Sequence, residues 1–114
     1  MIQSLLTAPH YQWGDKCDSW VLCEEEQLNV KYEKMPPYTR ERLHFHQHSL
    51  QFFFILKGTS TFSLDGELFE VQTQQGISIQ PHTKHYIENT TDGYLEFLVI
   101  SQPPVGSDRV NIDE

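Results

Sequence analysis

The feature that most constrains this chain is a series of short apolar or alternating runs, each separated from the next by turn residues. Apolar and polar residues alternate over 28–32, as in a strand with one buried face. Asp65-Gly66 separates two β-prone runs, 59–64 and 67–71, and this dipeptide is a strong hairpin signal. No segment has the period of a long amphipathic helix. The pattern predicts an all-β jelly roll or barrel of about eight to ten short strands, with little or no helix.

The expected strands are short and end at glycine, proline or other turn residues. They comprise residues 20–23, 28–32, 44–46, 51–57, 59–64, 67–71, 76–79, 85–89 and 94–100. Residues 102–114 contain Pro103-Pro104 and Gly106, which predict a tail or a strap over the surface. A chain of 114 residues is long enough for one core, so a single domain over residues 1–114 is expected.

The strand expected at 51–57 is apolar on both faces. Phe53 and Ile55 share the face of Gln51, whereas Phe52 and Phe54 point the other way. An antiparallel strand with one solvated face does not have this pattern. A second sheet layer or a second copy of the chain is therefore expected to cover the outer face, and we favour a homodimer.

The charge balance excludes some classes of partner. Eight Lys and Arg against sixteen Asp and Glu give a net charge of -8. Nucleic acids and anionic membranes need clustered cations, so neither is an expected partner. No apolar run approaches the ~20 residues of a membrane span. Residues 1–6 lack the features of a signal peptide, which predicts a cytoplasmic protein.

Three histidines form a candidate metal site. His44 and His46 are two residues apart in strand-like sequence, so their imidazoles project to the same face. His85 begins another expected strand. Three imidazoles that converge in a cavity can hold a divalent transition metal and leave a position open for water or substrate. The alternative is a surface strand with two solvated imidazoles.

Two stretches of the chain resemble the two sequence motifs of the cupin superfamily. The first stretch contains His44-Phe45-His46, Gln51 and Gly58. The second runs from Gly76 through Pro81 to His85 and Asn89. The resemblance covers residues 36–101 and implies a small single-domain cupin with a double-stranded β-helix. It also implies that His44, His46 and His85 bind a divalent ion, which could be Zn, Fe, Mn, Ni or Cu.

Gln51 stands where the family usually has a glutamate ligand. An amide oxygen can still coordinate, but it brings no negative charge. An ion bound by three imidazoles and an amide would keep its double charge and attract an anionic oxygen. Alternatively, Gln51 only forms hydrogen bonds within the pocket. His48 competes with Gln51 as fourth ligand, and the five-residue spacing from His46 to Gln51 requires a bend between them.

Two motif positions that commonly hold glycine are occupied by larger residues, Tyr38 and His82. Glycine often marks a positive φ, and histidine tolerates this conformation better than most residues. His82 is therefore expected in a surface loop, with a position over the cavity mouth as the alternative.

The resemblance implies a metal-dependent enzyme that acts on a small organic molecule, either by oxygenation or by redox-neutral isomerisation or cyclisation. His48 or His82 would be the catalytic base. The alternatives are a non-catalytic module that binds a sugar or another small molecule, and a metal-free sugar isomerase. Six residues are expected to line the cavity: Tyr32, Phe53, Ile55, Ile87, Phe97 and Val99.

Overall fold

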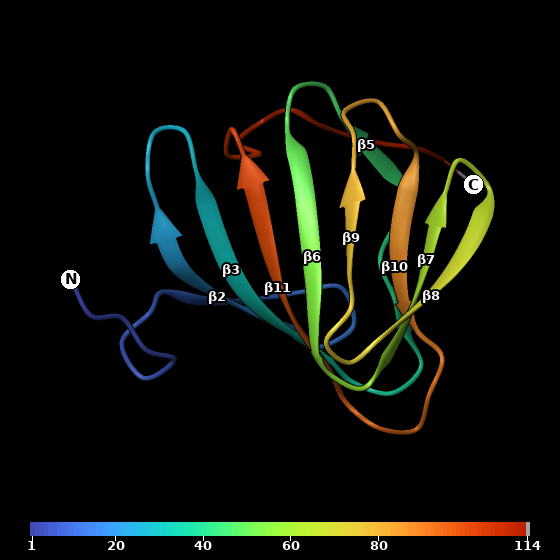
Figure 1. The fold of residues 1–114 in the computed structure, drawn as a ribbon, viewed down its shortest axis with the longest axis horizontal. Coiled ribbons are helices and arrows are strands. Elements are labelled where there is room, and N and C mark those ends of the chain that lie inside the picture. Colours follow the sequence, from blue (N-terminus) through green and yellow to red (C-terminus); the bar gives the residue numbers. More distant parts are fainter. Residues whose placement is uncertain (114) are drawn as a thin grey trace.

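The computed structural model describes residues 1–113 and consists of two antiparallel sheets packed face to face (Figure 1). The larger sheet has the order β1-β2-β3-β11-β6-β9. Its strands are β1 (His10–Trp13), β2 (Cys17–Glu24), β3 (Asn29–Met35), β11 (Leu95–Gln102), β6 (Leu50–Lys57) and β9 (Gly76–Ile79). No helix occurs among residues 1–113, and the predicted all-β jelly roll, a double-stranded β-helix, is confirmed.

The smaller sheet carries most of the residues that matter below. Its order is β12-β5-β10-β7-β8, and β4 pairs with β10 beside that path. Its strands are β4 (Thr39–Arg40), β5 (His44–His46), β7 (Thr59–Leu64), β8 (Glu67–Gln72), β10 (His85–Asn89) and β12 (Arg109–Asn111). Because β5 and β10 are adjacent, histidines from distant parts of the sequence lie next to one another.

The hairpin between β7 and β8 forms at the predicted dipeptide. Asp65 and Gly66 have φ values of 49° and 88°. Two consecutive positive φ angles define the type I′ turn, whose twist matches that of the flanking strands. This turn pairs Leu64 with Glu67 and fixes the register of the hairpin.

Three short strands were not expected from the sequence: β1, β4 and β12. Each has between two and four residues, which is too short for an alternating pattern to be recognised. Their strand conformation depends on partners elsewhere in the chain. In particular, β12 pairs with β5, so residues 109–111 form the edge strand of the smaller sheet.

The hydrophobic core lies between the sheets. Phe53 of β6 contacts Phe62 and Phe97, with ring centroids 5.1 and 5.7 Å apart. Ile55 and Ile87 are also fully buried. The two faces of β6 differ in burial, because Phe52 and Leu56 on the outer face are each 37% exposed.

The apolar outer face of β6 is not covered by a further sheet layer from residues 1–113. The expectation of a second layer from this chain is therefore wrong. The ring of Phe52 instead lies over Gly76 of neighbouring β9, where a Cβ atom would approach the ring to 2.4 Å. A second copy of the chain as the cover stays a prediction.

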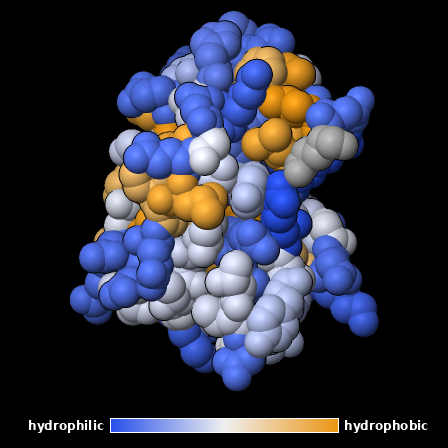
Figure 2. All heavy atoms as spheres, turned by 90° about the vertical axis from the view of Figure 1, so that its right-hand side faces the viewer, coloured by the Kyte–Doolittle hydropathy of each residue, from blue (hydrophilic) through white to orange (hydrophobic). Residues whose placement is uncertain are grey.

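The surface that carries β8 is largely hydrophilic, with separate hydrophobic patches (Figure 2). Leu68 and Phe69 of β8 are 64% and 38% exposed. Within residues 1–113, no helix is long and apolar enough to cross a membrane.

Candidate metal centre

A cavity of about 340 Å³ opens between the two sheets. His44 and His46 line it from the smaller sheet, and Gln51, Phe53 and Val99 line it from the larger one. This volume is at the lower end of the range for small-molecule pockets, so the cavity fits a compact ligand.

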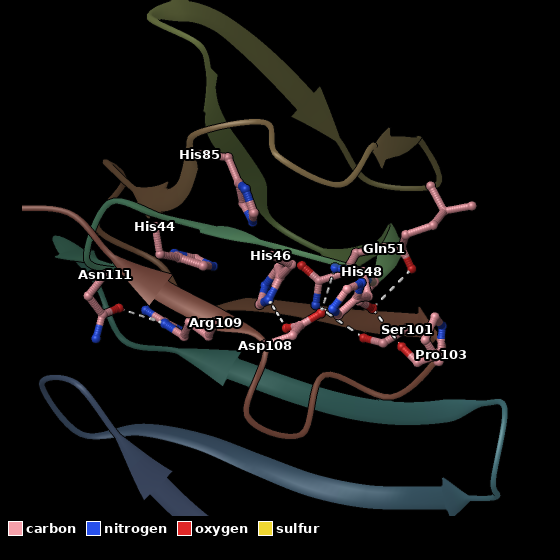
Figure 3. Close-up of polar contacts among 12 residues, drawn as sticks. His44, His46, His48, Gln51, His85, Ser101, Pro103, Asp108, Arg109 and Asn111 are labelled. Carbon is pink, nitrogen blue, oxygen red and sulfur yellow. Dashed lines mark hydrogen bonds and ion pairs between the residues drawn. The ribbon is translucent and has the colours of Figure 1, made fainter.

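His44, His46 and His85 converge beside this cavity (Figure 3). One nitrogen from each ring lies within 4.8 Å of the other two, and all three side chains are buried. The ring of His44 is 4.2 Å from that of His85 and 4.9 Å from that of His46, measured between centroids. His85 is the register partner of His44, so pairing of β10 with β5 brings the imidazoles together.

The hydrogen bonds of the three rings fix their tautomers. Nδ1 of His44 lies 2.7 Å from the Arg42 carbonyl, and Nδ1 of His85 lies 2.8 Å from the Thr83 carbonyl. A carbonyl oxygen only accepts, so both Nδ1 atoms carry the proton and both Nε2 atoms have a free lone pair. Nε2 of His85 is buried without a hydrogen-bond partner. An orphaned buried lone pair beside two further imidazoles fits a metal ion.

The third ring is oriented by a carboxylate from the C-terminal segment. Nδ1 of His46 lies 2.8 Å from Oδ1 of Asp108. Oδ2 of Asp108 accepts hydrogen bonds from the backbone N–H groups of His48 and Ser49. Burial favours the neutral acid, but these hydrogen bonds outweigh it and hold the pKa of Asp108 below its usual value. Asp108 therefore accepts from Nδ1, which directs Nε2 of His46 to the other two rings.

The protonation of the histidines suits metal binding. Burial lowers the pKa of His44 to about 2 and that of His85 to about 4, and it also lowers the pKa of His46. Neutral imidazole is the form that binds a metal. No proton therefore has to leave these rings near neutral pH before they can coordinate an ion.

Gln51 lies at the side of this group, and His48 does not. The Gln51 amide is buried, and its Nε2 donates to Ser101 Oγ at 3.1 Å. Residues 47–48 form the bend that the spacing requires. The His48 side chain is exposed and is not among the residues that line the cavity, within the described part of the chain.

The two motif positions that commonly hold glycine have a positive φ in this chain too. Tyr38 has a φ of 58° and His82 a φ of 70°, both in the left-handed region. His82 is exposed, and its backbone N–H donates to the His46 carbonyl at 2.7 Å. Over residues 1–113, the cavity lining does not include His82. Its loop bends back to the strand that carries two of the histidines, while its imidazole lies outside the cavity.

The expected lining is partly wrong. Phe53 and Val99 line the cavity, whereas Ile55, Ile87 and Phe97 belong to the adjacent core. The prediction fails at Tyr32, whose hydroxyl donates to Glu96 on the outer face of the larger sheet. The inner face of β3 instead presents Lys31 and Glu33 to the cavity. The usual rule that the apolar face of a strand points inward therefore fails for β3, because its inner face borders a polar cavity.

The sequence analysis missed several charged residues at this site. Glu33, Glu41 and Arg109 line the cavity, and Asp108 contacts His46. Glu33 could have been suspected because it shares a strand face with buried Met35. The other three carry no local signal, because their positions depend on contacts with distant strands.

Both cavity carboxyl groups are perturbed. Burial raises the pKa of Glu41 to about 7, although the Arg109 charge opposes the shift. Burial also raises the pKa of Glu33. Arg109 approaches Glu41 to 3.5 Å, and Glu41 lies 3.9 Å from Nδ1 of His44. Carboxyl groups that are costly to ionise are typical of functional sites.

The fold agrees with the comparison with known families. The cupin domain family matches residues 31–101. This match covers more than half of the chain, and the chain belongs to the cupin domain family.

A known relative is similar in sequence over most of the chain. An uncharacterised protein of Methanocaldococcus jannaschii is 36% identical over 80 residues, which are 70% of this chain and 64% of that protein. The chain thus spans slightly less than two thirds of this relative.

Two solved structures are similar at low identity. A predicted oxalate decarboxylase from Thermotoga maritima has a TM-score of 0.82 at 19% identity, over 91% of this chain and 100% of that one. A sugar phosphate isomerase of the cupin superfamily from Silicibacter pomeroyi has a TM-score of 0.78 at 16% identity, over 91% and 76%. At these identities the likeness shows the fold alone.

Proposed function

We propose that this protein is a metal-dependent enzyme that carries out a redox-neutral reaction on a small organic molecule. His44, His46 and His85 would hold a divalent transition metal, and the amide oxygen of Gln51 would be the fourth protein ligand. The observation that supports this most is the buried group of three imidazoles, with ring nitrogens within 4.8 Å of one another and their Nδ1 atoms bonded elsewhere.

The bound ion would act as a Lewis acid that polarises a substrate oxygen. The neutral Gln51 would leave the positive charge of the centre undiminished. Glu33 and Glu41 line the same cavity, so a carboxyl group is available to move a proton on a bound substrate. We therefore propose proton transfer by one of these glutamates, in place of the exposed His48 and His82.

The choice of redox-neutral chemistry over oxygenation also has support from similar proteins. Two structural neighbours are described as a predicted oxalate decarboxylase and a sugar phosphate isomerase. Neither reaction type incorporates oxygen into the substrate, and both classes of substrate are small anions. A cavity of about 340 Å³ has room for molecules of that size.

The first test is metal analysis of the untagged protein, followed by a search for proton exchange. We expect about one transition-metal ion per chain, and little or none in a folded His46→Ala variant. The wild-type protein should then catalyse the exchange of a substrate proton for deuterium in D₂O. NMR measures this exchange over a panel of hydroxy acids, keto acids and sugar phosphates. Glu33→Gln or Glu41→Gln should abolish the exchange while metal content stays the same.

Two results would contradict this function. A wild-type protein that neither contains metal nor takes it up would leave a binding module or a metal-free isomerase. Substrate-dependent oxygen consumption would assign the protein to the oxygenases instead. Gln75→Ala changes an exposed position away from the metal centre. As the matched control, it should keep the metal content and the proton exchange of the wild type.

A further inference from the structure

We propose that the substrate of this cavity is a small organic anion and that Arg109 binds its negative group. This inference rests on the proposed function for the role of the ion, but the anion site itself is built from residues of the chain.

The pairing of β12 places Arg109 on the same sheet face as the histidines. Arg109 is the register partner of His46, and Asn111 is the partner of His44. Directly opposed residues in an antiparallel pair project to the same face. Arg109 accordingly lines the cavity with His44 and His46 (Figure 3).

The backbone around Arg109 is held at both ends. The Gln47 N–H donates to the Asp108 carbonyl at 3.2 Å, and the Ile112 N–H donates to the Leu43 carbonyl at 3.0 Å. The Arg109 side chain is directed by Asn111, whose Oδ1 accepts from Nε at 2.8 Å. The guanidinium is therefore oriented before a ligand arrives, which reduces the entropic cost of binding.

The arginines that line the cavity differ in where their charge lies. The Arg40 guanidinium lies 3.7 Å from the centroid of the Tyr86 ring, and Arg42 pairs with Asp113 at 2.9 Å. Arg109 is the arginine whose register places it beside the histidines. A positive charge at that position attracts an anion and disfavours a cationic ligand.

Arg109 acts on the metal centre electrostatically. Burial is the main cause that lowers the pKa values of His44, His46 and His85, and the Arg109 charge contributes to all three. A divalent ion on these rings would repel the nearby guanidinium. An anion between the two positive groups relieves this repulsion and gains from both charges. Gln51 is neutral, whereas a glutamate at this position would bring a negative charge. The ligand would therefore supply the negative charge beside the ion.

The guanidinium also matches the shape of such a ligand. Its planar fork presents five N–H donors that suit a carboxylate or phosphate group. Within the described residues its contacts are Asn111 at Nε and Glu41 at a long 3.5 Å. Its side chain is 35% exposed, so a ligand that enters the cavity can reach it.

The test is isothermal titration calorimetry on the full chain, both zinc-loaded and metal-free, with malonate, inorganic phosphate and the neutral isostere malonamide. We expect malonate and phosphate to bind and malonamide to bind at least about tenfold more weakly. Arg109→Gln should weaken malonate binding by about tenfold or more, and Arg109→Lys should fall between. Lys57→Gln removes a cation from the outer face of the larger sheet and should bind like wild type.

The proposal is overturned if no anion binds, if malonamide binds as tightly as malonate, or if folded Arg109→Gln binds malonate like wild type. If Arg109→Gln does not fold, the comparison of malonate with malonamide on the wild-type protein decides whether the cavity binds an anion. Metal analysis separates this failure from that of the proposed function. Arg109-dependent malonate binding to a chain that takes no metal supports the anion site alone.

Discussion

At the scale of single residues, each histidine of the centre has one ring nitrogen bonded to an oxygen acceptor and the other left for an ion. Two acceptors are backbone carbonyls, those of Arg42 and Thr83. A backbone acceptor persists whatever the side chain at that position. Only the His46 ring depends on a side chain, Asp108. The spacing predicted that His44 and His46 share a face, and the motif resemblance added His85, whereas the tautomers of the rings could not be predicted.

The cavity carboxyl groups are expected to lower stability as they ionise. Burial raises the pKa of Glu33, so the native state holds its proton to higher pH than the unfolded chain. The stabilising effect of the protonated form is present below the ordinary glutamate pKa of 4.5 and is lost as pH rises through the raised value. Glu33→Gln should therefore gain stability relative to wild type as pH rises above 4.5, until the raised pKa of Glu33 is passed.

Urea denaturation of the metal-free proteins across this range measures the difference. Glu67→Gln, which removes an exposed carboxylate from the β7–β8 hairpin, is the control for loss of one negative charge. A Glu33→Gln difference that does not change with pH would show that Glu33 titrates as it does in the unfolded chain.

At the scale of elements, the centre depends on a strand outside the family match. The cupin family matches residues 31–101, whereas Asp108 and β12 follow that range. β12 lies along β5 and adds Arg109 to the cavity, while Asp108 binds the loop at 48–49. The Ser49 hydroxyl also donates to the Pro103 carbonyl at 2.7 Å. The C-terminal segment is thus connected to the histidine-bearing strand along most of its length.

Asp108→Asn should weaken metal binding by about tenfold to hundredfold, because a carboxylate that orients a metal-binding histidine has effects of this size. The matched control is Asp113→Asn in the same segment, where the carboxylate is 99% exposed and pairs with Arg42. Competition with a chromogenic chelator measures the affinity. Nitrogen NMR of the metal-free protein should show a changed tautomer at His46, with His44 and His85 unchanged. Equal affinities for the two variants would contradict a positioning role.

At the scale of the whole molecule, the proposed ligands come from three strands of the two sheets. His44 and His46 lie on β5, His85 on β10 and Gln51 on β6 of the other sheet. An ion held by all four would connect the two sheets beside the core, where Phe53 lines the cavity and also packs in the core. Metal binding and global stability should therefore be coupled.

Zinc at about a hundredfold excess over its dissociation constant should stabilise the native state by about 2.7 kcal/mol. For a domain of this size that corresponds to a rise in Tm of roughly 10 °C. Differential scanning calorimetry with zinc or with a chelator measures the shift, and His85→Ala should reduce it strongly. Identical melting of wild type under both conditions would mean that the native state does not bind the ion.

The sequence by itself determined the all-β class, most strand positions, the β7–β8 turn and the bend after His46. These follow from alternation and turn chemistry, which act over a few neighbouring residues. The motif resemblance added the family and the three histidines as candidate ligands, and their metal role stays a prediction.

Only the tertiary structure decided which residues surround those histidines. Asp108 meets His46 across 62 positions of sequence, and Arg109 reaches the cavity because β12 pairs with β5. Glu33 points inward, and Tyr32 outward, because the inner face of β3 borders a polar cavity. Long-range pairing sets these contacts, and no local pattern of residues encodes which distant strands will pair.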